Sequence, residues 1–199
     1  TEKDAFHETF TTMAFLAGVT KKAVLASGVL ILPQRQTGVV AKQTAEIDIL
    51  SAGRMRLGIG VGWNHVEYEA LAIDWKSRGA RQAEQIEVMR KLWTEDRVSF
   101  EGEFYKTESA TIYDKPADPV QIYVAGAGPA VAKYAGRMCD GFICTSGKAW
   151  KLYTETLLPN VEEGLQLSSK KKPNYDRMIE MKVSFDTDKD RALQDTRHW

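Results

Sequence analysis

Apolar residues recur along the chain in two patterns that alternate, one with the spacing of a strand and one with the spacing of a helix. Strand patterns predict five strands, at residues 23–32, 54–60, 120–125, 141–144 and 178–185. Helical spacing predicts helices at residues 6–17, 40–50, 86–93, 129–136, 150–167 and from 188 onward. Alternation of this kind predicts an α/β fold with a parallel sheet, either doubly wound or closed into a barrel.

Two local features refine this pattern. The first helix carries one apolar stripe and is expected to end at Gly18, a residue suited to the position after a helix. That stripe consists of Phe6, Phe10, Met13, Ala14 and Ala17. Residues 97–113 interrupt the alternation and predict a small β-hairpin that turns at Gly102 and resumes as strand at Phe104.

A closed barrel takes about 250 residues, so we expect these 199 residues to be a fragment.

Composition narrows the class of protein. The chain is 43% hydrophobic and 27% charged, as in an ordinary globular domain. Lys and Arg together number 27 and balance 27 acidic residues, which gives no electrostatic footprint for nucleic acid or an anionic membrane. There is neither a signal-peptide pattern nor a long apolar run, which favours a cytoplasmic protein. Cys139 and Cys144 are expected to be buried, reduced thiols, and no metal-ligand set is expected.

Glycines mark the ends of two predicted strands in the first half of the chain. In a parallel sheet, ligands bind at the carboxyl ends of the strands. Gly28 and Val29 lie in the first strand, where a glycine indicates a bulge, tight packing or the close approach of a ligand. Residues 58–62 end the second strand with three glycines, followed by Trp63 rather than by an expected helix start. This run is either a turn or a backbone surface for a flat ligand.

Two further strand ends favour anions. Residues 125–129, AGAGP, join a strand to a helix, where free backbone N–H groups and the helix dipole attract phosphate. Thr145 and Lys148 follow the next strand as a second candidate anion site. His7 and His65 are expected near the same edge and are candidate proton acceptors, with plain polar surface as the alternative.

Several of these motifs carry a family resemblance. Residues 120–148, which include VAGAGP and TSGK, closely resemble the deazaflavin-dependent glucose-6-phosphate dehydrogenases of the luciferase-like oxidoreductase superfamily. The likeness continues through LYTETLLP and the terminal MIEMKVSFD and TRHW. The earlier ASGVLILPQR and LGIGVGWNHVEYEAL are similar to the broader group of coenzyme F420-dependent members of the superfamily.

The resemblance implies a (β/α)8 TIM barrel of the luciferase-like type, incomplete here, with residues 1–199 as one partial domain. It implies an oxidoreductase that transfers hydride between deazaflavin C5 and a small organic substrate such as glucose 6-phosphate. The peptide between Gly28 and Val29 falls where the family has a non-proline cis bond against the cofactor. Thr145 and Lys148 match positions that hold the sugar phosphate. Positions implied to contact the cofactor are Gly28, Val29, Gly60, Val61, Gly62, Trp63, Ala125, Gly126, Ala127, Gly128 and Pro129.

The resemblance is incomplete at the substrate side. The sugar-phosphate enzymes have an acidic residue, their proposed acid, where this chain has Trp63. Other substrate-binding residues of these enzymes would lie before Thr1 or after Trp199. An FMN-dependent monooxygenase of the same superfamily therefore stays an alternative, as does a non-catalytic flavin-binding fragment. Relatives are commonly dimers, so the resemblance also suggests a homodimer.

Overall fold

The computed structural model describes residues 7–145, 147–181 and 183–198. The chain divides into two compact units, Thr1–Tyr123 and Val124–Trp199. Strand β6 (Gln121–Gly126) runs across the boundary between them.

The first unit is built on short parallel strands. Strands β1 (Leu25–Ala26) and β2 (Leu30–Ile31) both pair in parallel with β3 (Met55–Gly60), with Leu25 opposite Met55 and Leu30 opposite Ile59. Leu25, Leu30, Met55, Leu57 and Ile59 are buried, as expected for strands of a parallel sheet. The predicted strand at 54–60 is confirmed.

The predicted continuous strand at residues 23–32 is wrong, because the chain leaves the ladder between β1 and β2. The hydroxyl of the buried Ser27 donates to the Gly58 carbonyl at 2.8 Å and accepts from the Gly58 N–H at 2.9 Å. A side chain thus takes over the hydrogen bonds that a strand residue would make with its backbone. The next peptide, Gly28–Val29, is cis. Beyond β2 the chain enters a short 3-10 helix, η1 (Leu32–Gln34).

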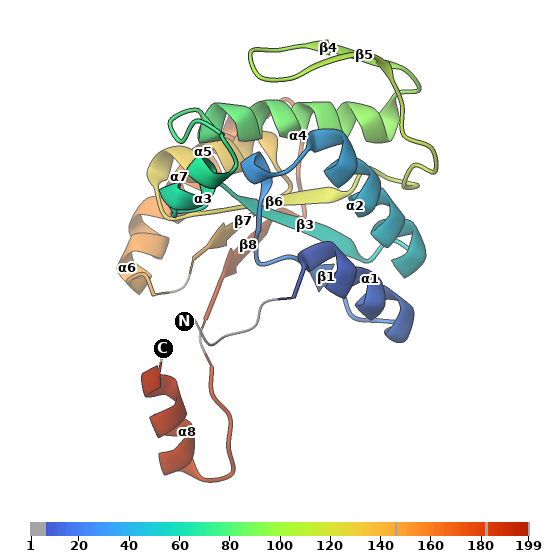
Figure 1. Ribbon diagram of the computed structural model, residues 1–199. Helices are drawn as coiled ribbons and strands as arrows, with labels where there is room; N and C mark the ends of the chain where they lie inside the picture. The colour runs from blue at the N-terminus through green and yellow to red at the C-terminus, as the bar shows by residue number, and fades with distance from the viewer. Residues whose placement is uncertain (1–6, 146, 182, 199) are drawn as a thin grey trace. The chain divides into compact units, whose positions relative to one another are not determined.

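Among the described residues of the first unit, α-helices accompany these strands (Figure 1). They are α1 (Thr9–Val19), α2 (Thr37–Ser51), α3 (His65–Ala70) and α4 (Arg78–Thr94). In α1 the stripe residues Phe10, Met13 and Ala17 are buried, but Ala14 is exposed. Phe6 lies outside the described residues. Gly18 does not end α1, because the helix continues to Val19 and the Thr20 N–H still bonds to the Leu16 carbonyl.

The predicted hairpin is confirmed, with β4 (Val98–Glu101) antiparallel to β5 (Lys106–Ala110). It lies beside α4 in Figure 1. The second strand begins at Lys106 rather than at Phe104. The reason is Glu84 of α4, whose carboxylate accepts from the backbone N–H groups of Glu103, Phe104 and Tyr105 at 2.8–3.2 Å. These residues therefore bond to a side chain instead of to a strand.

The second unit repeats the alternation of strand and helix. Strands β7 (Gly141–Cys144) and β8 (Asp176–Ile179) pair in parallel. The helical segments are α5 (Pro129–Met138), α6 (Trp150–Leu152), the π-helical turn η2 (Tyr153–Leu157), α7 (Leu158–Gln166), α8 (Lys189–Asp195) and the 3-10 turn η3 (Thr196–His198). Helices α5 and α7 cross closely, since a Cβ on Gly136 would lie 2.2 Å from the Val161 carbonyl oxygen.

The last predicted strand, 178–185, is largely wrong. Strand β8 ends at Ile179, opposite the last residue of β7, Cys144. Just beyond it, the Glu180 N–H bonds to the Cys144 carbonyl at 2.9 Å. Met181, Val183 and Phe185 keep the apolar alternation of a strand but are exposed. The alternation therefore continues past the point where β7 offers a partner.

Lys170, Lys171 and Lys172 form a short basic run of the kind that predicts a solvated loop, but this prediction is wrong for Lys172. Its ammonium donates to the carbonyls of Gly136, Arg137 and Cys139 at 2.7–3.0 Å. These carbonyls lie at the end of α5, where a cation is favoured by the helix dipole. Cys139 and Cys144 are buried, as expected. Within the described ranges, no helix is long and apolar enough to span a bilayer.

Candidate functional site

The carboxyl end of β3 is a tight glycine turn. Gly62 has a φ of +69°, in the left-handed region that favours glycine. A Cβ at Gly62 would lie 3.1 Å from the Ile31 side chain, so this turn packs directly on β2. The turn leaves Trp63 with 87% of its surface exposed. A large apolar ring is thus presented to solvent from a fixed backbone.

A helix begins immediately after this turn, contrary to the expectation that Trp63, Asn64 and His65 are not a helix start. The Asn64 side chain accepts from the Val66 N–H at 3.2 Å and donates to Glu67 at 3.1 Å. Asn is a preferred N-cap, and an acidic residue three positions later completes a capping arrangement. The sequence therefore did carry a signal for α3.

Tyr68 of α3 fixes the turn through a hydrogen bond to its backbone. Its side chain is fully buried, and its hydroxyl donates to the Val61 carbonyl at 2.6 Å. Burial raises the pKa of Tyr68 to about 12, so the phenol stays a protonated donor well above neutral pH. Sequence reasoning missed this residue, because a tyrosine at a helical core position is usually only packing.

Gly28 and Val29 lie on the chain segment next to this turn. The peptide between them is cis, at the bond where the resemblance placed it. A Cβ built on Gly28 would have no neighbour within 4 Å, so the space beside this backbone is open. Since Ile31 pairs with Gly60 and touches Gly62, the structure brings β2, which directly follows Gly28 and Val29 in the chain, together with Gly60–Gly62.

The second unit supplies the other glycine turn. Ala125 is buried at the end of β6, and a Cβ on Gly126 would lie 2.3 Å from Val131 Cγ1. Gly128 is the N-cap of α5 and makes no side-chain hydrogen bond, while Pro129 begins the helix. The N–H groups of the first turn of α5 therefore have no side-chain cap, as an anion site requires. Ala127 between the two glycines is half-buried.

Thr145 and Lys148 follow β7 in the same unit. Thr145 is half-buried and Lys148 is exposed. Gly147 between them has a φ of +74°. Burial raises the pKa of the Cys144 thiol, and the nearby charge of Lys148 opposes that rise. Ser146 lies outside the described residues.

The two candidate proton acceptors are both at the surface. His7 precedes Glu8, the N-cap of α1, and His65 is the first residue of α3. Both are exposed. Neither imidazole has a hydrogen-bond partner among the residues that the structure describes. His65 lies three residues after Gly62, so it is the histidine nearer in sequence to the glycine turn.

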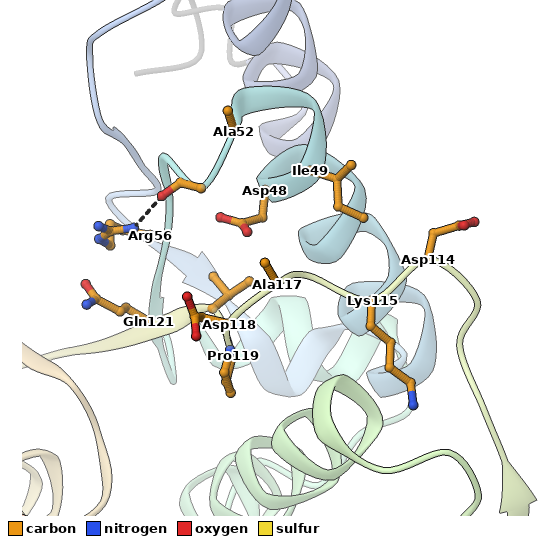
Figure 2. A pocket seen from close by; sticks show the side chains of 12 residues that line it. Asp48, Ile49, Ala52, Arg56, Asp114, Lys115, Ala117, Asp118, Pro119 and Gln121 are labelled. Carbon is orange, nitrogen blue, oxygen red and sulfur yellow. Dashed lines mark hydrogen bonds between the residues drawn. The ribbon is translucent and has the colours of Figure 1, made fainter.

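A cavity of about 770 Å³ lies at the other end of β3 (Figure 2). Its walls are formed by Asp48, Ile49, Ala52, Gly53, Arg56, Asp114, Lys115, Ala117, Asp118, Pro119, Val120 and Gln121. Figure 2 shows Arg56 bonded to the Gly53 carbonyl across one wall. In parallel α/β folds the amino ends of the strands serve stability rather than ligand binding. Over the described part of the chain, no cluster of His, Cys, Asp or Glu could hold a metal ion.

Comparisons with known proteins agree with this arrangement. A family model described as luciferase-like monooxygenase matches residues 1–199. An F420-dependent glucose-6-phosphate dehydrogenase of Nakamurella multipartita is 47% identical over 184 residues, which cover 90% of this chain and 54% of that protein. The chain thus spans about half the length of the curated relatives it matches.

Solved structures show the same fold. A monooxygenase from Streptomyces bottropensis superposes with a TM-score of 0.87 at 24% identity, covering 98% of this chain and 62% of that one. An F420-dependent secondary alcohol dehydrogenase in complex with an F420-acetone adduct gives 0.84 at 25% identity, covering 97% and 59%. The expected luciferase-like TIM-barrel fold, present in part, is confirmed.

Proposed function

The chain belongs to the luciferase-like monooxygenase family, and from this we propose that it functions in a coenzyme F420-dependent oxidoreductase. The observation that carries the proposal is the 47% identity, over 90% of the chain, to a protein named F420-dependent glucose-6-phosphate dehydrogenase. The first candidate substrate is therefore a sugar phosphate. Both units are proposed to be parts of one domain, which the match over residues 1–199 supports.

The residues present fit the proposed cofactor in two respects. In the first unit, the backbone of Gly28 has open space beside it, and the turn at Gly60–Gly62 presents main chain rather than side chains. Such a surface suits a flat ring system. In the second unit, the uncapped start of α5 at Gly128 suits the phosphate of the cofactor. Val29, Val61, Trp63 and Ala125–Pro129 are proposed to complete these contacts.

The cofactor and the protein would contribute different parts of the reaction. Bound F420 would supply hydride chemistry at C5. The protein's own residues would bind and orient: the turn at Gly60–Gly62 would contact the ring, the start of α5 would bind the cofactor phosphate, and Thr145 and Lys148 would bind the substrate phosphate as hydroxyl and point charge. Trp63 would cover the substrate with its exposed indole. His65, or else His7, would accept the proton of the substrate hydroxyl.

Cofactor uptake and turnover test the proposal directly. We expect saturable uptake of F420 by the full 199-residue chain, read as quenching of F420 fluorescence. With glucose 6-phosphate we expect bleaching of the oxidised cofactor absorbance, and Lys148→Ala should raise the KM for the sugar phosphate while leaving F420 uptake unchanged. Lys170→Ala in the exposed loop is the matched control. Uptake of F420 without any effect of Lys148→Ala on glucose 6-phosphate binding would reject the sugar phosphate at this site, and no uptake would reject the cofactor.

The same titrations distinguish the alternatives. Tight uptake of FMN in preference to F420 would instead support a monooxygenase. Uptake of neither would support a non-catalytic fragment. A cytoplasmic homodimer without nucleic-acid partners stays a prediction from composition and resemblance, which light scattering of the purified chain can check for the dimer.

A further inference from the structure

The ring of Tyr68 is held in place by two layers of side chains. Trp75 meets it edge to face, with ring centroids 5.1 Å apart and an interplanar angle of 85°. The guanidinium of Arg78 lies 3.7 Å from the centroid of Trp75 and donates to the Trp75 carbonyl at 2.8 Å. The Asp74 carboxylate accepts from the N–H groups of Lys76 and Ser77, which fixes the loop that carries Trp75. The phenol therefore has little freedom to turn.

The hydroxyl at the end of this ring determines one peptide plane of the glycine turn. It donates to the carbonyl of Val61 at 2.6 Å, and this carbonyl belongs to the Val61–Gly62 peptide. In a planar trans peptide the C=O and N–H point in opposite directions. The Gly62 N–H therefore points away from the Tyr68 hydroxyl.

The Gly62 N–H has no hydrogen-bond partner within the ranges that the structure describes. Gly62 lies next to Ile31 of β2, on the carboxyl side of the strands. Gly62 itself is held by its φ of +69° and by its contact with Ile31. A backbone donor in a fixed orientation, without a partner, suits a ligand oxygen.

We propose that Tyr68 is a positioning residue: its hydroxyl holds the Val61 carbonyl so that the Gly62 N–H donates to a carbonyl oxygen of the bound cofactor ring. This inference rests on the proposed function for its ligand. Tyr68 does not touch the cofactor and acts only through the backbone. Its phenol is protonated at neutral pH, as any tyrosine is, and burial raises its pKa to about 12, so the phenol stays a donor in alkaline solution as well.

The test removes one oxygen atom, that of the Tyr68 hydroxyl. In Tyr68→Phe the ring and its contact with Trp75 remain, and only the bond to Val61 is lost. We expect the Kd for F420 to rise about tenfold, the upper range for one hydrogen bond, with the absorbance band of bound F420 shifted toward that of the free cofactor. In the wild type the Gly62 amide resonance should move on F420 addition, and in Tyr68→Phe it should move less.

Tyr175→Phe is the matched control, because Tyr175 is also buried and its hydroxyl has no partner among the described residues. This variant should bind F420 as the wild type does. Without any cofactor, amide exchange at Gly62 should be about tenfold faster in Tyr68→Phe and unchanged in Tyr175→Phe. Equal exchange at Gly62 in wild type and Tyr68→Phe, or equal F420 affinity and spectrum, would overturn the proposal.

The proposed function and the positioning role of Tyr68 are rejected by different results. No F420 uptake by the wild type rejects the proposed function and, with it, the cofactor as partner of the Gly62 N–H. Wild-type uptake with unaltered Tyr68→Phe uptake rejects the positioning role alone. If Tyr68→Phe does not fold, Trp75→Phe is the second variant, because it keeps the Tyr68 hydroxyl but weakens the packing that holds the Tyr68 ring. We expect Trp75→Phe to raise the Kd for F420 by a smaller factor than tenfold. An unchanged Kd would count against the proposal.

Discussion

The two glycine turns, Gly60–Gly62 and Gly126–Gly128, look alike in the sequence but use glycine for different physical reasons. At Gly62 the backbone is left-handed, with a φ of +69°, and the nearest atoms to a built Cβ are at 3.1 Å. At Gly126 the conformation is one that other residues adopt, but a Cβ would lie 2.3 Å from Val131. The turn at Gly60–Gly62 needs glycine for its left-handed backbone conformation, and the turn at Gly126–Gly128 needs glycine because there is no space for a Cβ.

The turns also differ in what holds them. The first is fixed by side chains of the helix that follows it, through Tyr68 on Val61 and Glu67 on Asn64. The second begins a helix whose N-cap, Gly128, makes no side-chain bond. A turn that contacts a flat ring benefits from a fixed plane, whereas a turn that binds phosphate must leave its N–H groups available. The difference matches the two roles proposed for them.

The largest effect is expected at the turn that needs space. Gly126→Ala should lower the free energy of unfolding by about 2–3 kcal/mol, because its methyl group overlaps the stiff, branched Val131 side chain. Val131→Ala in the same chain should recover most of that loss. Denaturant unfolding of the four proteins of this double-mutant cycle measures the coupling. A Gly126→Ala variant as stable as the wild type would show that the space is not needed.

A smaller effect with a different signature is expected at the turn that needs a conformation. Gly62→Ala should cost about 1–2 kcal/mol, the usual cost of a left-handed residue with a Cβ. Ile31→Val should recover little of it, because shortening the neighbour leaves φ unchanged. The same unfolding cycle measures this coupling. Full recovery in the double variant would show that crowding by Ile31, and not backbone conformation, makes Gly62 necessary.

Periodicity in the sequence predicted most elements of both units. The strands at 54–60 and 141–144 and the helix that begins at Pro129 follow from local pattern alone, because buried apolar runs and a proline at the first helical position act within a few residues. The cis peptide at Gly28–Val29 was anticipated only through family resemblance. No propensity along the chain distinguishes that glycine from one in an ordinary bulge.

The features that sequence reasoning missed depend on partners far along the chain. Ser27 breaks the first strand through its bonds to Gly58, 31 residues away. Glu84 delays the start of β5 by binding backbone 19–21 residues later. The apolar alternation at 181–185 continues where β7 no longer provides a partner. Such contacts exist only once the fold brings the segments together, so a local pattern cannot reveal them.

The smallest effect on stability is expected from the hydrogen bonds of Glu67, beside the turn at Gly60–Gly62. Glu67 accepts from Gln34 at 2.9 Å and from Asn64 at 3.1 Å, and so links the segment after β2 to the start of α3. Glu67→Gln replaces one acceptor oxygen by a donor that would face another donor. Since these groups are exposed, we expect a loss of only about 0.5 kcal/mol in unfolding free energy.

Glu69→Gln is the control for this change, because it removes the same charge from the same helix, and no hydrogen bond of the Glu69 carboxylate is recorded with the described residues. Denaturant midpoints measured side by side should fall for Glu67→Gln and stay unchanged for Glu69→Gln. Amide exchange should also rise at Asn64 and Val66, near the lost bond, but not at Gly128 in the second turn. Equal midpoints for the two variants would mean that the Glu67 bonds add nothing, and that Tyr68 and the left-handed Gly62 hold the first turn by themselves.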